Sequence, residues 1–321
     1  VRLLDEGNTI PFIARYRKEL HGAMDDTTLR TLADRLQYLR NLDKRREEVK
    51  ASIEGQGKLT EELSAAIDAA ATLAEVEDLY LPYKPKRRTR ATMAKEKGLE
   101  PLADALFAKG NPVDPAALAA DFIDPERGVE TVEDALQGAS DIIAEAISDD
   151  AAVRKALREL YLRRGTLVSR AAEEEPADTV YRLYYDFTAP VNRVQGHQVL
   201  AINRGEREGI LKAGVELDGE TAKVAVRRQV VPGRAAMDFV RAAADDAWDR
   251  LLKPSLEREI RNTLTEQADE GAIHNFALNL KPLLMQPPVK GFVTMGLDPG
   301  YRNGCKVAVV DATGKVLDTA V

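Results

Sequence analysis

The sequence of 321 residues contains a single cysteine, Cys305, which excludes an internal disulfide and any metal site built on several cysteines. Its three histidines, His21, His197 and His274, are too scattered to form a recognisable metal-binding motif. No apolar run approaches the roughly 20 residues that a membrane-spanning helix needs, and the first residues lack the apolar core of a signal peptide. We therefore expect a cytoplasmic protein with no membrane partner and no cofactor.

Sequence motifs of several enzyme classes are absent as well. The chain has no Gly-x-x-x-x-Gly-Lys-Ser/Thr phosphate loop, no Gly-x-Gly-x-x-Gly turn, no His-Glu-x-x-His pair and no serine-centred nucleophile elbow. Aromatic residues make up only 5% of the chain, whereas residues that lose little side-chain entropy in a helix (Ala, Leu, Glu and Arg) are abundant. This composition favours a mainly α protein, and the absent motifs favour one that is not an enzyme by itself.

The net charge of −7 at pH 7 argues against a protein that covers nucleic acid with its whole surface. The Debye length at cellular salt is only about 8 Å, so a local excess of cations can still act by itself. Any contact with nucleic acid is therefore expected at a small positive site on a negative body.

Helical periodicity dominates the first half of the chain. After the capping cluster Asp25–Thr28, apolar residues recur at helical spacing as far as Ile53, which predicts a long central helix of about 28 residues. Gly55 and Gly57 should end it. Other predicted helices cover residues 60–71, 73–81, 101–108 and 115–122, two segments between 132 and 165, and residues 235–252 and 254–280.

Small β elements are expected near residues 166–228, where the helical period is weak. The sequence predicts a short strand at Thr166–Ser169 and a hairpin over Gly214–Val226 that turns through Asp218-Gly219. A helical region subdivided near residues 100–130 and 166–230 would account for this pattern.

A change of period marks the start of a second domain. Past the breaker Pro287-Pro288 the pattern becomes strand-like. We expect one helical region over residues 1–289 and a truncated α/β domain over residues 290–321, with strands at 292–297, 306–310 and 316–321 around a turn at 311–315.

A cation-rich run is the first candidate site. It holds five cations within seven residues: Lys84, Lys86, Arg87, Arg88 and Arg90. Cations bind phosphates and aromatic rings stack on bases, so we predict that this run and Tyr83 bind RNA or DNA. The prolines should keep the segment extended, with its side chains directed outward. The alternative is that the cations neutralise Glu75, Glu77 and Asp78 and fix a loop to the helices.

A second run, residues 9–19, should begin a helix at Pro11. Near its end lie three further cations that could contact phosphate: Arg15, Arg17 and Lys18. Charge patterning favours the alternative, an ion-pair lattice with Glu19, Asp25 and Asp26.

Asp298 is the third candidate. An aspartate at the end of a buried strand, followed by Pro299-Gly300, is typical of the first metal ligand in ribonuclease-H-like nucleases, and a related strand and turn hold nucleotide phosphates in actin-like ATPases. Either activity needs carboxylates or loops from later strands. We therefore expect Asp298 to be a vestigial catalytic residue that caps a turn, in a chain that cannot catalyse a reaction by itself.

Four blocks together resemble the Tex family of bacterial transcription accessory proteins. In order along the chain they are residues 9–19, 56–60, 77–91 and 296–308, of which the third is the most specific. The resemblance implies a helical N-terminal region, a ribonuclease-H-like YqgF domain that generally lacks the full set of catalytic carboxylates, helix-hairpin-helix motifs and an OB-fold RNA-binding domain. Only the helical region, without its opening helix, and the first strands of the YqgF domain are expected here.

The residues and the resemblance together predict a non-catalytic scaffold that binds RNA or DNA in transcription. Two alternatives stay open. One is a metal-dependent nuclease, in the longer protein, with Asp298 as its first metal ligand. The other is a docking module for RNA polymerase or the ribosome.

Overall fold

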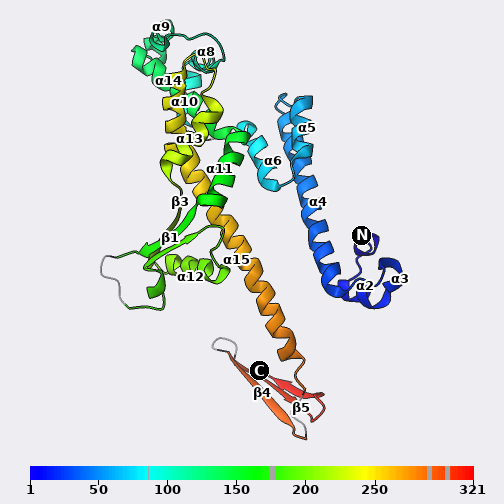
Figure 1. Cartoon of the computed structure of the whole chain (residues 1–321). Coiled ribbons are helices and arrows are strands. Elements are labelled where there is room, and N and C mark those ends of the chain that lie inside the picture. The colour runs from blue at the N-terminus through cyan, green and yellow to red at the C-terminus, as the bar shows by residue number, and fades with distance from the viewer. Residues whose placement is uncertain (86, 174–177, 288–290, 301–303) are drawn as a thin grey trace. The chain divides into compact units, whose positions relative to one another are not determined.

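The computed structural model describes residues 1–85, 87–173, 178–287, 291–300 and 304–321. Helices predominate among them and the strands form two small sheets, which confirms the mainly α prediction (Figure 1). The chain divides into two compact units. Unit 1 comprises Val1–Val168, Phe187–Arg193 and Gly214–Arg261, and unit 2 comprises Ser169–Asp186, Val194–Ala213 and Asn262–Val321. None of the described helices is long and apolar enough to cross a membrane.

The predicted central helix is confirmed as α4 (Asp26–Glu54), which has 29 residues. Its start is fixed by Asp25, whose carboxylate accepts a hydrogen bond from the Thr28 amide at 2.7 Å. The chain turns away after it at Gly57, which has a φ of 67°. The short helices α1 (Arg2–Asp5), α2 (Ile10–Tyr16) and α3 (Lys18–His21) precede it and lie near its N-terminal end (Figure 1).

The C-terminal half of α4 packs against α5 (Glu61–Ala69) and α6 (Leu73–Tyr80). This contact buries one apolar cluster that consists of Leu42, Val49, Ile53, Ile67, Ala70, Val76 and Tyr80. Burial of apolar surface of this kind stabilises a helix far more than its intrinsic propensity does. The cluster therefore fixes the segment that leads into the cation-rich run.

The rest of unit 1 is built around α10 (Val132–Asp149), whose Ile142, Ile143 and Ile147 are buried. Among the helices that contact it are α7 (Arg90–Glu96), α8 (Glu100–Phe107), α9 (Pro115–Ala120), α11 (Ala151–Arg164) and α14 (Met237–Asp246). Asp150 ends α10 and starts α11, because its carboxylate accepts hydrogen bonds from the amides of Ala152 and Val153. The helices predicted between residues 132 and 165 are confirmed.

The first sheet has the strand order β2-β1-β3 and consists of β1 (Thr166–Ala171), β2 (Asp186–Pro190) and β3 (Leu211–Glu216). The predicted hairpin over Gly214–Val226 is wrong, because a helix, α13 (Gly219–Val230), follows β3. Asp218 caps that helix by accepting a hydrogen bond from the Thr221 amide at 2.8 Å. Ala222, Val226 and Val230 are buried four residues apart, on one helical face.

The chain then continues into a long helical segment. The π-helical turn η4 (Ala247–Leu252) follows α14, and α15 (Lys253–Leu284) follows it with Pro254 in its first turn. The helix predicted from Pro254 is therefore confirmed. In unit 2, α12 (Gly196–Arg207), which the weak period concealed, is linked to α15 by a hydrogen bond from Asn203 to Thr265 at 2.9 Å.

The second sheet lies in unit 2 and has the antiparallel order β4-β5-β6. Its strands are β4 (Thr294–Gly300), β5 (Gly304–Val310) and β6 (Val316–Ala320), so the three predicted strands are confirmed. The Asp311 carboxylate accepts hydrogen bonds from the amides of Thr313 and Lys315 and closes the predicted turn. The domain boundaries predicted near residues 100–130, 166–230 and 290 stay predictions.

Candidate nucleic-acid interface

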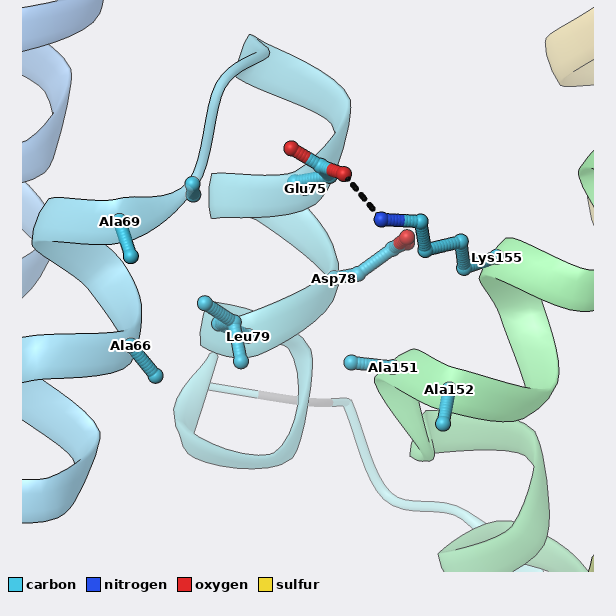
Figure 2. A pocket seen from close by; sticks show the side chains of 9 residues that line it. Ala66, Ala69, Glu75, Asp78, Leu79, Ala151, Ala152 and Lys155 are labelled. Carbon is cyan, nitrogen blue, oxygen red and sulfur yellow. Dashed lines mark hydrogen bonds and ion pairs between the residues drawn. The ribbon is translucent and has the colours of Figure 1, made fainter.

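Three acidic residues of α6 precede the cation-rich run, and each binds a cation from another helix. Glu75 accepts from the Lys155 ammonium at 2.7 Å, and Glu77 from the Arg45 guanidinium at 2.6 Å. Figure 2 shows Glu75 on α6 directed toward Lys155 on α11. This hydrogen bond from Lys155 lowers the pKa of Glu75 below its ordinary value. These two acids are therefore already neutralised by partners outside the run.

The third acid, Asp78, belongs to a buried network of four charges. Its two carboxylate oxygens accept from Arg154 and Arg158, each at 2.8 Å. Both arginines also bind Glu259 of α15, and Arg154 reaches the Ser255 hydroxyl at 3.3 Å. Only 4% of Asp78 and 6% of Arg154 is exposed. Two cations and two anions therefore balance each other inside unit 1.

The cations of the run are placed differently. Lys84, Arg87 and Arg90 are exposed, and within the described parts of the chain none of their side chains has an ion pair or hydrogen bond. Arg88 binds Glu96 at 3.1 Å in a pair whose side chains are 72% and 61% exposed. Lys86 lies outside the described residues. For the four described cations, the alternative that they neutralise the acids of α6 is wrong.

The backbone of the run is only partly extended. It begins with a 3₁₀ turn, η1 (Leu81–Tyr83), and becomes extended at Lys84, which has a ψ of 130°. It ends where Thr89 caps α7, so Arg90 is the first residue of that helix. The prediction of an extended segment is wrong at both ends, because Pro82 suits the first turn of a helix and Thr89 is a good N-cap.

Tyr83 fixes the start of this loop. Its half-buried ring packs against the apolar cluster of α4, α5 and α6, and its carbonyl accepts a hydrogen bond from the Gln56 side chain at 3.0 Å. The loop is thereby held against the C-terminal end of α4. The predicted stacking of Tyr83 on a base stays a prediction.

The loop borders a cleft of about 730 Å³ in unit 1. Lys58, on the segment after α4, lines this cleft together with Lys84. Lys58 is also exposed and has no ion pair among the described residues. Sequence reasoning missed it, although it lies in the block 56–60, because only the packing of η1 on the end of α4 brings Lys58 and Lys84 to one cleft.

The second run forms α2, as predicted, with Thr9 as its N-cap. Arg15 and Lys18 are exposed and, in the part of the chain that the structure describes, make no ion pair. The Arg17 guanidinium lies 5.2 Å from the centre of the Phe12 ring, within the range of a cation–π contact. Two of the three predicted cations are therefore available to an external anion.

The favoured alternative for this run, an ion-pair lattice, is wrong. Asp25 caps α4, and hydrogen bonds from the side chain and the amide of Thr28 lower the pKa of Asp25 below its ordinary value. Asp26 binds Arg30 of its own helix at 2.8 Å. Glu19 is exposed and forms no ion pair with the described cations. Capping and local pairing within α4 thus use the carboxylates that the lattice needed.

Asp298 does not lie at the end of a buried strand, so that prediction is wrong. It lies within β4, opposite Lys306 of β5, and pairing continues beyond it to Gly300 and Gly304. Asp298 is exposed, as is most of β4. Among the described residues no three potential metal ligands come together. Its role as a metal ligand, and the absence of enzymatic activity, stay predictions.

Family comparisons match three ranges of the chain. A Tex-like protein N-terminal domain matches residues 1–54, a Tex central region residues 111–276, and a Tex protein YqgF-like domain residues 292–321. The central match alone covers about half of the chain. The cation-rich run lies between the first two matched ranges.

Relatives match the chain along its whole length. It is 47% identical to the uncharacterized protein YdcI of Bacillus subtilis, over 99% of this chain and 45% of that protein. It is 42% identical to the transcriptional accessory protein Tex of Neisseria gonorrhoeae, over 100% and 43%. It is 34% identical to the human S1 RNA-binding domain-containing protein 1, over 100% and 34%. The chain therefore spans less than half the length of each of these relatives.

Proposed function

The chain belongs to the Tex family, and from this premise we propose that it is a non-catalytic scaffold that binds RNA or DNA during transcription in the cytoplasm. The contact is made by the exposed cations Lys84, Arg87 and Arg90, with Lys58 beside them and Arg15 and Lys18 as a second contact. The helices of unit 1 supply the rigid frame.

One observation carries this proposal. The three acids that precede the run are bound by cations of other helices, whereas Lys84, Arg87 and Arg90 have no ionic partner among the described residues. A cation whose charge is not neutralised within the protein can displace the counterions of a phosphate and gain binding free energy from their release. The run thus behaves as a positive site on a chain with a net charge of −7.

The names of the relatives support the nucleic-acid part of the proposal. One of them is called a transcriptional accessory protein and another an S1 RNA-binding domain-containing protein. Their names describe proteins more than twice as long as this chain, so the contribution of this region needs its own test.

The test is binding of a labelled single-stranded RNA to the chain, measured by fluorescence anisotropy at low salt. The triple variant Lys84→Ala/Arg87→Ala/Arg90→Ala should bind at least tenfold more weakly. A matched control removes three exposed cations that already have ion-pair partners three or four residues away: Arg2, Arg163 and Arg241. Both variants change the net charge equally. Equal affinities of the two variants would contradict the proposal.

Docking to RNA polymerase or the ribosome is the second candidate, and an apolar groove on α4 favours it. The groove measures about 520 Å³, and Leu32, Leu36 and Leu39 line it. Exposed apolar grooves of this kind commonly mark protein contacts. Leu36→Asp/Leu39→Asp should abolish co-sedimentation of the chain with purified polymerase or ribosomes. Sedimentation equal to that of the parent would rule this groove out.

A further inference from the structure

The cleft beside Lys84 has walls of three kinds. Pro82, Tyr83 and Ile142 contribute apolar surface, as do Pro85 and Ala146. Lys58 and Lys84 belong to the segment after α4 and to the loop, and a third lining lysine, Lys95, belongs to α7. At about 730 Å³ the cleft is within the range of sites that hold a small organic molecule, which is roughly 300–1,000 Å³. It is therefore large enough for a nucleobase.

Other residues that line the cleft are acidic. Helices α8 and α10 and the start of α11 supply five carboxylates: Glu100, Asp104, Glu145, Asp149 and Asp150. Glu100 binds Lys95 at 2.7 Å, and Asp150 accepts from the amides that begin α11. Asp104 is exposed, and its carboxylate has no ion pair or hydrogen bond within the described residues. Asp104 is thus available as an acceptor.

This arrangement sets the orientation of a bound strand. A phosphate is repelled by these carboxylates and attracted by Lys58 and Lys84, so we expect the backbone of a polynucleotide to follow the loop and the segment after α4. A base turned away from that backbone would enter between the apolar walls and face carboxylates. Carboxylate oxygens accept hydrogen bonds from an exocyclic amino group, as they do from N4 of cytosine, whereas uracil and thymine lack this donor.

We propose that the cleft holds one unstacked, amino-bearing base of a single-stranded polynucleotide, whose phosphates lie on Lys84, Arg87, Arg90 and Lys58. Asp104 accepts the hydrogen bond from the exocyclic amino group. This inference rests on the proposed function, and it adds to that function a preference for single strands and for cytosine over uracil or thymine. Double-stranded nucleic acid is excluded, because its bases are stacked and paired.

The test uses three oligodeoxynucleotides of equal length: oligodeoxycytidine, oligodeoxythymidine and an abasic strand. The parent chain should bind oligodeoxycytidine about tenfold more tightly than oligodeoxythymidine, in line with one good carboxylate–amino contact. It should bind the abasic strand more weakly than either, because stacking is lost. A second series with oligoribocytidine and oligoribouridine shows whether the preference holds for RNA, for DNA or for both. Equal affinities for cytosine and for uracil or thymine in both series would overturn the inference.

Two variants locate the preference in the cleft. Asp104→Ala removes an exposed carboxylate that has no ion pair or hydrogen bond among the described residues. It should lower the affinity for oligodeoxycytidine several-fold, whereas the affinity for oligodeoxythymidine should not fall. Ala146→Trp fills the cleft from an exposed position of α10 without a change of charge. It should weaken both base-bearing strands and leave the abasic strand unaffected. If both variants keep the full preference of the parent, the cleft is not the base site.

The abasic strand separates this inference from the proposed function. Lys84→Ala/Arg87→Ala/Arg90→Ala should weaken binding of the abasic strand, because this strand offers phosphates alone. If the triple variant binds the abasic strand more weakly but the parent shows no preference for cytosine, the phosphate contact is supported and the base site is wrong. If the abasic strand binds the triple variant as it binds the parent, the phosphate contact itself is wrong.

Discussion

Unit 1 contains two groups of arginines that differ in burial and in ion pairing. Arg154 and Arg158 share Asp78 and Glu259 in a network that is almost closed to water. Arg87 and Arg90, which follow Asp78 by 9 and 12 residues, are exposed and without ionic partners among the described residues. The first group joins three helices. The second group leaves its charge available to a ligand.

From this comparison we propose that the stability of the fold and the binding of nucleic acid depend on separate cations. A buried ion pair stabilises the fold little more than a pair of apolar residues would. Removal of one partner, however, leaves a buried charge that neither water nor protein compensates. Removal of an exposed cation hardly changes the free energy of unfolding. Changes in the network should therefore affect unfolding, and changes in the loop should affect binding.

The largest effect is expected when the network loses one anion. Asp78→Ala leaves Arg154 and Arg158 to share Glu259, with one positive charge in excess. We expect a loss of about 3–5 kcal/mol in the free energy of unfolding. Urea unfolding followed by the fluorescence of Trp248 measures it, since this residue is the sole tryptophan and is buried in unit 1. A loss below about 1 kcal/mol would show that the network is not a stabilising junction.

A double variant measures the coupling between Asp78 and Arg154. Asp78→Ala/Arg154→Ala removes one charge of each sign and leaves the pair of Arg158 with Glu259. The loss in the free energy of unfolding of the double variant should therefore be smaller than the sum of the losses of the two single variants. We expect the difference, which is the coupling energy, to be about 0.5–3 kcal/mol. Strict additivity of the three variants in urea unfolding would show that the charges act independently.

A smaller and pH-dependent effect is expected at Glu75. The hydrogen bond from Lys155 lowers the pKa of Glu75 in the folded chain, so this group stabilises the fold above the ordinary glutamate pKa of about 4.3. That contribution is lost as the pH falls through the lower, folded pKa. The difference in urea midpoint between the parent and Lys155→Ala should be present at pH 7 and vanish at low pH. A difference in urea midpoint that grows as the pH falls would contradict this prediction.

The smallest effect on stability is expected in the loop. Among the described residues, Arg88→Ala breaks one ion pair, the exposed pair with Glu96. Each loop substitution should change the free energy of unfolding by no more than about 0.5 kcal/mol. Urea unfolding of Arg88→Ala and of the triple loop variant checks this. A large loss from either would mean that the loop cations hold the fold together, which would remove the contrast with the buried network.

The sequence predicted elements well where caps and period agree. Asp25, Thr60 and Asp150 each cap a helix at the predicted place. The hairpin predicted at Asp218-Gly219 is wrong because this dipeptide suits a hairpin turn and a helix start equally. The packing of the apolar residues Ala222, Val226 and Val230 decides between the two structures.

The candidate site was predictable only in part. A local count of charges finds the cation-rich run, but it does not show which cations are already paired. Asp78 is separated from Arg154 by 76 residues, and Arg154 from Glu259 by 105, so their pairing exists only in the folded chain. Lys58 and the acidic residues of the cleft escape a local count for the same reason.

The central claim is that the exposed loop cations bind phosphate, and the salt dependence of binding tests it most directly. Each phosphate contact to a single strand contributes about 0.7 to the slope of log affinity against log salt. Lys84→Ala/Arg87→Ala/Arg90→Ala should therefore lower this slope by about 2 relative to the parent. The control variant at Arg2, Arg163 and Arg241 should keep it. An equal slope for the parent and the loop variant would contradict the account.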